Sequence, residues 1–141
     1  MQHIVFLDRA TLIADLRAPA FAHRWTDHDA TPPHLTATRL IDADIAIVNK
    51  VRVDTAVLQA APALRLVAVA ATGVNNIDLA ACRAHDVAVC NIRGYAEHTV
   101  PEHVFMLLLA LRRNLVAWRR SLRAGAWQRA EMFCLFDHPM H

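Results

Sequence analysis

The chain has 141 residues, of which 55% are hydrophobic and 20% are charged, so one globular unit is expected and a disordered or fibrous polymer is excluded. The formal net charge is only +2, which makes no general case for binding nucleic acid. The three glycines, Gly73, Gly94 and Gly125, are isolated from one another. These residues therefore contain no glycine-rich loop of the kind that cradles a phosphate.

The sequence also bears on the compartment of the protein and on membrane and metal binding. Three cysteines without a CxxC pair indicate reduced thiols in a cytoplasmic protein. The first eight residues lack the features of a secretory signal, so export is not expected. The longest apolar run, Val104 to Leu111, is far shorter than the roughly 20 residues that span a membrane. The nine histidines show no HxxxH spacing, so no metal site is expected.

Apolar runs alternate with helical patterns along the chain, which is typical of a parallel sheet with crossover helices. In chain order, the predicted strands cover residues 3–8, 21–25, 43–49, 64–70 and 87–92. Helices are predicted over 9–16, from Thr31 to Leu40, over 54–61, and after Asp78 as far as His85. Asp54 and Asp78 are the predicted N-caps. The predicted fold class is α/β, an open parallel sheet with helices on both faces.

A long helix is predicted after the last strand. Thr99-Val100-Pro101-Glu102 matches a capping box with proline in the first turn, and Gly125 would end the helix after Ala124. Such a helix would hold roughly 25 residues and extend ~37 Å, more than a compact domain of this size needs. The run Val104 to Leu111 is apolar on all sides and predicts burial against another surface. We therefore expect a first domain over 1–98 and a second over 99–141.

Two loops carry most of the functional expectation, because ligands of open parallel sheets bind beyond the carboxyl ends of the strands. Asn49-Lys50-Val51-Arg52 follows the third strand, and Thr72-Gly73-Val74-Asn75 follows the fourth. In the second loop a glycine lets backbone amides approach a ligand, and the N-terminus of the next helix favours an anion. A small carboxylate or phosphate would suit these loops, with the sole lysine, Lys50, as a cation.

Several segments, taken in order, resemble the amino-terminal half of the NAD(P)-dependent D-2-hydroxyacid dehydrogenases. These segments are Val67–Asp78, Val87–Ile92 and Thr99–His103. Phe133–Pro139 resembles the segment before the cofactor motif in bacterial glycerate dehydrogenases, also called hydroxypyruvate reductases. The resemblance covers essentially the whole chain. It implies a flavodoxin-like first domain, followed by a long helix that would begin a Rossmann cofactor domain.

The resemblance also implies roles for individual residues. The substrate carboxylate would be bound by Thr72, Gly73, Val74 and Asn75, with Asn49, Lys50 and Val51 closing the other side. Thr72 also matches a position near the cofactor phosphates, and Val100 matches one that lines the cofactor site, the cofactor of the full-length parent being NAD or NADP.

The resemblance implies a small 2-oxo or 2-hydroxy acid as substrate and a homodimer through the long helix. The family's glycine fingerprint and its catalytic arginine, glutamate and histidine match no position in this sequence. We therefore expect no catalytic residue in this chain, and no activity from the chain alone.

The same residues also allow other interpretations. Gly73 could serve only a tight turn, and Lys50 could be a solvated charge. The neighbouring Asn75, Asn76 and Asp78 could serve only to cap a helix. A response-regulator receiver would need clustered acids after the first strand, where Asp8 stands alone. A truncated, non-catalytic module that associates with itself or with a partner would expose the apolar start of the long helix and form oligomers.

Overall fold

The computed structural model describes residues 1–132. The segment 133–141, with the predictions made for Phe133–Pro139 and for the thiol of Cys134, lies outside the described residues. The chain divides into two compact units, Met1–Arg93 and a second unit that begins at Gly94. The predicted strands all fall in the first unit, and the predicted long helix falls in the second.

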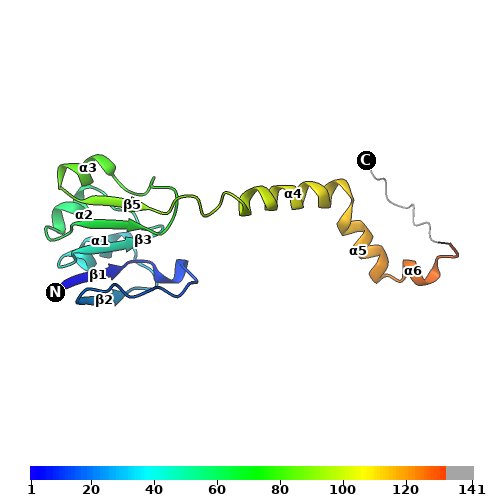
Figure 1. The fold of residues 1–141 in the computed structure, drawn as a ribbon, viewed down its shortest axis with the longest axis horizontal. Helices are drawn as coiled ribbons and strands as arrows, with labels where there is room; N and C mark the ends of the chain where they lie inside the picture. The colour runs from blue at the N-terminus through cyan, green and yellow to red at the C-terminus, as the bar shows by residue number, and fades with distance from the viewer. Residues whose placement is uncertain (133–141) are drawn as a thin grey trace. The chain divides into compact units, whose positions relative to one another are not determined.

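A five-stranded parallel sheet forms the centre of the first unit (Figure 1). Its strands are β1 (Gln2–Phe6), β2 (His23–Asp27), β3 (Ile45–Val48), β4 (Leu66–Val69) and β5 (Ala88–Asn91). Their order across the sheet is β2-β1-β3-β4-β5, and every neighbouring pair is parallel. Val48 of β3 lies opposite Val69 of β4, so these two strands end level with each other. The predicted α/β class with an open parallel sheet is confirmed.

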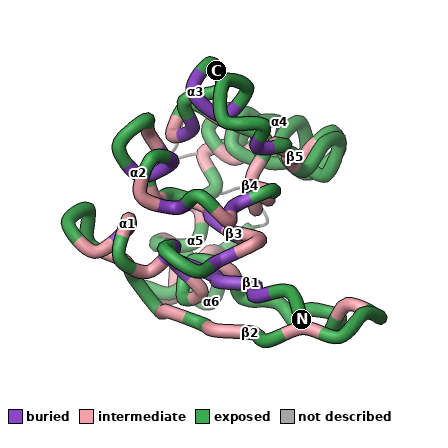
Figure 2. The backbone as a smooth tube through the Cα atoms, turned by 90° about the vertical axis from the view of Figure 1, so that its left-hand side faces the viewer, coloured by how far each residue is buried: buried purple, intermediate pink, exposed green. Residues whose placement is uncertain are grey.

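One face of this sheet packs against helices to form the main core. The helices are α1 (Pro33–Leu40), α2 (Thr55–Ala60) and α3 (Leu79–Ala84). Alternate strand residues such as Val5, Ala46, Val48 and Val67 are fully buried in this core, as expected where successive side chains point to opposite faces. The buried stretches are purple in Figure 2. Burial of this face fixes the register of the strands and thereby the positions of the loops that follow them.

The segment after β1 differs from the prediction. The helix expected over 9–16 is wrong: only a 3-10 turn, η1 (Arg9–Thr11), forms there. The Arg9 guanidinium donates to the carbonyl oxygens of Leu12 and Ala14, and Asp8 gives η1 no side-chain cap. A segment this short does not hold a helix by itself. Residues 9–16 therefore contain no α-helix.

The second unit contains three helices among the described residues: α4 (Thr99–Arg112), α5 (Leu115–Arg123) and α6 (Ala126–Arg129). A helix does begin at Thr99 as predicted, but His98 occupies the N-cap without a side-chain hydrogen bond, so the capping box is not formed. The single helix to Ala124 is also wrong, because Asn114 adopts a left-handed φ of 52° between α4 and α5. Gly125, with a φ of 79°, ends α5 as predicted.

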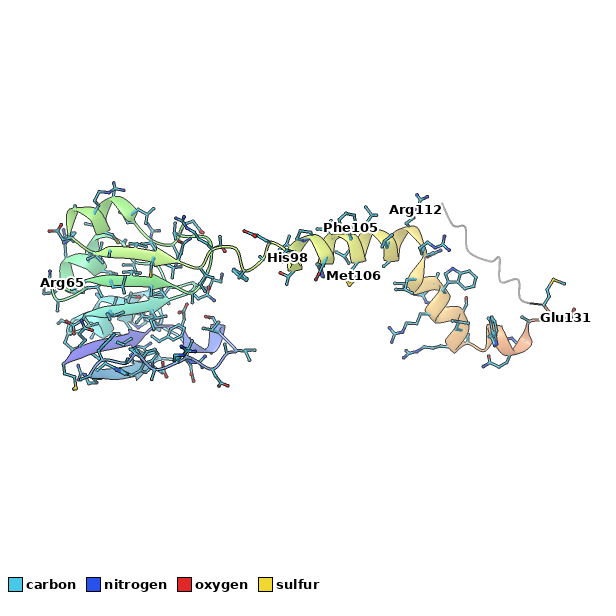
Figure 3. All side chains as sticks on the ribbon, in the orientation of Figure 1. Arg65, His98, Phe105, Met106, Arg112 and Glu131 are labelled. Atoms are coloured by element: carbon cyan, nitrogen blue, oxygen red, sulfur yellow. The ribbon has the colours of Figure 1, made fainter. Side chains whose placement is uncertain are left out.

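Apolar side chains are exposed around α4. Phe105 is 63% exposed, Met106 53% and Leu111 80%, and Figure 3 shows Phe105 and Met106 on different sides of the helix. No helix among the described residues is long and apolar enough to cross a membrane. An apolar surface of this extent is typical of a helix that packs against a further surface.

Candidate functional site

The loops that follow β3 and β4 meet at one edge of the sheet. Together they line a cavity of about 160 Å³. Its lining residues are Asn49, Lys50, Ala71, Gly73, Asn75 and Asn76. The tertiary structure thus brings together four of the residues singled out from the sequence. Val51, Thr72 and Val74 belong to the same loops but do not line this cavity.

Backbone pairing holds the two loops side by side. Val53 and Ile77 form an isolated parallel bridge. The amide of Val53 donates to the carbonyl oxygen of Asn76 at 2.9 Å, and the amide of Asp78 donates to the carbonyl oxygen of Val53 at 2.9 Å. These bonds extend the parallel pairing of the chain beyond the ends of β3 and β4. Backbone hydrogen bonds between the loops therefore position the cavity walls, in addition to those of the sheet.

Asp8, two residues after the end of β1, was missed by reasoning from the sequence. Its side chain accepts hydrogen bonds from the amide of Asn49 at 2.9 and 3.1 Å, from Lys50 at 2.6 Å and from Val51 at 3.2 Å. Asp8 is only 3% exposed. Because the carboxylate already occupies these three amides, they do not serve a substrate anion. The first loop contributes the Lys50 side chain instead.

Asn76 was assigned no more than a capping role, yet it binds the first loop from the other side. Its Nδ2 donates to the carbonyl oxygen of Val51 at 2.8 Å and to that of Asn49 at 3.4 Å. Asn49 in turn donates from Nδ2 to Thr11 Oγ1 at 3.0 Å. The signal that could have found Asn76 is its place two residues before the Asp78 cap, where a side chain can reach the neighbouring strand end.

The second loop offers backbone donors. Within the part of the chain that the structure describes, no protein acceptor pairs with the amides of residues 72–75. Their carbonyl side is anchored instead, because Asn91 Nδ2 donates to the Thr72 carbonyl at 2.7 Å and the Ile92 amide donates to the Ala71 carbonyl at 3.1 Å. A Cβ at Gly73 would lie 3.2 Å from Asn75 Oδ1. Glycine therefore leaves the loop backbone open at the cavity.

A side chain caps the N-terminus of α3, which the sequence suggested would favour an anion. Asp78 caps α3 by accepting from the amide of Ala81 at 2.9 Å, which confirms its predicted capping role. α3 has only six residues, and a carboxylate already lies at its first turn. The donors available to an anion are therefore the loop amides before Asp78.

Lys50 supplies the positive charge of the cavity. It is exposed and is the only charged residue among those that line the cavity. Arg52, two residues on, points elsewhere: its Nε lies 3.7 Å from Asp54 Oδ2 and it does not line this cavity. A cation beside unpaired backbone amides can bind a small carboxylate.

Shifted pKa values occur away from the cavity. Burial raises the pKa of the Cys82 thiol, with Asp78 adding to the effect. A hydrogen bond from Arg24 lowers the pKa of Asp42, and burial lowers the pKa of His28. None of these groups lines the cavity.

Metal and dinucleotide sites need different sets of residues. The described residues hold no cluster of histidine, cysteine or acidic side chains that could ligate a metal ion. Thr72 lies in the first unit, whereas Val100, 57% exposed on α4, lies in the second. The sequence has no glycine-rich motif for a pyrophosphate. The expected contacts of Thr72 and Val100 with a dinucleotide therefore stay predictions.

Comparison with known proteins identifies the family. The model for the D-isomer specific 2-hydroxyacid dehydrogenase catalytic domain matches residues 7–131. The chain belongs to this family. Among its 2-hydroxyacid dehydrogenase relatives is a glycerate dehydrogenase from Methylorubrum extorquens, 44% identical over 139 residues. That match covers 98% of this chain and 44% of the relative, so the chain spans less than half of the relative's length.

Solved structures show the same fold. An acyclic imino acid reductase, in complex with NADPH and D-Arg, superimposes with a TM-score of 0.73 at 20% identity, covering 96% of this chain and 43% of that one. An NADPH-dependent glyoxylate/hydroxypyruvate reductase from Sinorhizobium meliloti, in complex with citrate, gives a TM-score of 0.69 at 21% identity, covering 99% and 44%. Both structures show that this chain shares their fold.

Proposed function

We propose that this chain is the substrate-binding half of an oxidoreductase that transfers hydride between NAD(P)H and a small 2-oxo or D-2-hydroxy acid. The substrate would be of the glycerate, hydroxypyruvate or glyoxylate type, in keeping with the similarity to a glycerate dehydrogenase at 44% identity. Its carboxylate would bind in the cavity between the loops Asn49–Val51 and Thr72–Asn75. One observation carries the proposal: these loops, 20 residues apart in the sequence, enclose a single cavity.

The chemistry of the cavity supports a small carboxylate. Lys50 supplies one positive charge, and Gly73 and Asn75, which line the cavity, have backbone amides without protein partners among the described residues. The cavity is small, about 160 Å³, in keeping with a small acid. Holding the carboxylate would orient the adjoining carbonyl carbon for reaction, a contribution that can be large.

The cofactor supplies the hydride when it is bound. Thr72 and Val100 stay as proposed contacts of NAD or NADP, but the residues present do not form a complete site. We accordingly assign no proton donor and no catalytic residue here. The 141-residue chain, assayed alone with NADH and hydroxypyruvate, is expected to show no turnover, and robust NADH oxidation would contradict this assignment.

A titration tests the proposed site directly. Glyoxylate, added to the ¹⁵N-labelled chain, is expected to shift the amide resonances of Gly73, Asn75 and Lys50 in a saturable manner. Glycolaldehyde is the matched control, because it keeps two carbons and a carbonyl but lacks the carboxylate. Equal shifts with both compounds, or no saturable shift with glyoxylate, would refute a carboxylate site in this cavity.

Self-association is the second function that an observation favours. The exposed apolar residues of α4, such as Phe105 and Leu111, suit a homodimer through this helix. The same surface would serve a non-catalytic module that associates with itself or with a partner. Sedimentation of the chain over a range of concentrations tests this, and a clean monomer throughout would refute it.

Two broader assignments accompany the proposal. We propose a substrate-binding domain over 1–98 and the start of a cofactor domain over 99–141. We also propose a cytoplasmic location, in keeping with free thiols at Cys82, which is buried, and Cys90, which is exposed. Reduced cysteines are the rule in that compartment.

A further inference from the structure

Asp8 is a buried carboxylate with an unusual set of partners. It follows β1, is 3% exposed, and accepts from three consecutive backbone amides, those of Asn49, Lys50 and Val51, at 2.6–3.2 Å. Burying a carboxylate is costly unless it is well hydrogen-bonded, and here several donors share the charge. These donors lie 41 to 43 residues away in the sequence. The contact therefore joins the end of β1 to the loop after β3.

The other side of the same loop is also held. With its amide groups directed at Asp8, the loop presents the carbonyl oxygens of Asn49 and Val51 to Asn76 Nδ2, at 3.4 and 2.8 Å. Asn76 comes from the loop after β4 and itself lines the cavity. The loop is thus bound on its donor side and on its acceptor side, across the ends of three adjacent strands.

We propose that Asp8 and Asn76 are positioning residues that together hold the loop Asn49–Val51 in the shape that places Lys50 at the cavity. This inference rests on the proposed function, since it concerns the same carboxylate site. The hydrogen bonds described join these two residues to the loop and not to the substrate. Their role is to remove loop motion before the ligand arrives, so that binding does not have to order the loop.

The test compares two isosteric substitutions. Asp8→Asn places an amide group, itself a donor, among the three backbone donors. Asp44→Asn is the matched control, because Asp44 Oδ2 also accepts from a backbone amide, that of His3 at 2.7 Å, but at the amino end of the sheet. Hydrogen exchange is measured at the amides of residues 49–51, and glyoxylate affinity is measured by the amide titration.

Asp8→Asn is expected to speed exchange at residues 49–51 by at least about tenfold relative to Asp44→Asn, as expected when a charge-assisted bond is lost. It is also expected to weaken glyoxylate binding by about tenfold. If Asp8→Asn does not fold, Asn76→Ala releases the loop from its acceptor side. Because Asn76 itself lines the cavity, the readout for this variant is the exchange rate at residues 49–51, which should rise.

The outcomes separate this inference from the function on which it rests. Equal exchange rates in the Asp8→Asn and Asp44→Asn chains would refute the clamp. A freed loop with unchanged glyoxylate affinity would refute the positioning role while leaving the carboxylate site intact. If the wild-type chain binds no glyoxylate, the proposed function fails, and the exchange comparison still decides whether Asp8 fixes the loop.

Discussion

Replacing Lys50 with glutamine removes the only charged side chain of the cavity. Two unit charges about 4 Å apart interact by about 1 kcal/mol in water and by about 4 kcal/mol near a protein surface. Because Lys50 is exposed, the lower figure applies. About 1 kcal/mol corresponds to about fivefold in Kd. We therefore expect Lys50→Gln to weaken glyoxylate binding about fivefold.

Arg52→Gln is the control for this prediction. It removes the same charge two residues away, from a side chain that is 80% exposed and lies against Asp54. The assay is the glyoxylate titration followed at Gly73 and Asn75. The advantage of the wild type over Lys50→Gln should shrink as salt is raised from 0.01 to 1 M, because the screening length falls from about 30 to about 3 Å. An unchanged Kd in Lys50→Gln, or an equal loss in Arg52→Gln, would refute the role of Lys50.

Three further predictions concern stability and the second loop. Asp78→Ala removes the cap on α3 and should cost about 1 kcal/mol of unfolding free energy, measured by denaturant titration; no change would contradict the capping contact. Gly73→Ala should affect glyoxylate binding more strongly than stability, because the added Cβ meets Asn75 Oδ1 at 3.2 Å. The Kd for glyoxylate and the melting temperature measure the two effects, and unchanged binding would contradict a close contact of this Cβ with Asn75. Asp42→Asn should make the melting temperature depend less on pH at acid pH. Arg24 holds the pKa of Asp42 below its ordinary value of 3.8, so the contribution of Asp42 is present above that pH and lost as the pH falls through the folded-state value; melting temperatures from pH 3 to 7 measure it, and identical slopes would contradict it.

Local features were predictable because they depend on neighbours in the sequence. Asp54 and Asp78 cap α2 and α3 as predicted, by accepting from the amides of Val57 and Ala81. Gly125 ends α5 in the left-handed conformation that glycine adopts easily. The alternation of apolar runs and helices likewise predicted a parallel sheet, since both faces of its inner strands are rich in apolar residues.

Two helices were predicted wrongly, because the apolar spacing that indicated them does not register side-chain hydrogen bonds or the backbone conformation of single residues. Residues 9–16 carry a weak helical pattern, but Asp8 is engaged by the loop after β3 and Arg9 binds nearby carbonyls, so a 3-10 turn forms. The apolar pattern runs without interruption past Asn114, yet that residue takes a left-handed conformation and divides the helix. Asparagine tolerates this conformation better than most residues, which periodicity does not register.

The sequence by itself determined the chemistry at the ends of β3 and β4: a single lysine, a glycine and several asparagines in two loops. Only the tertiary structure decided that the two loops share a cavity, because the strand order places β3 beside β4 with level ends. It also decided which donors are left for a ligand. Asp8 accepts from the amides of the first loop, which lie 41 to 43 residues away in the sequence. No local pattern contains this pairing, because only the folding of the chain brings the partners together.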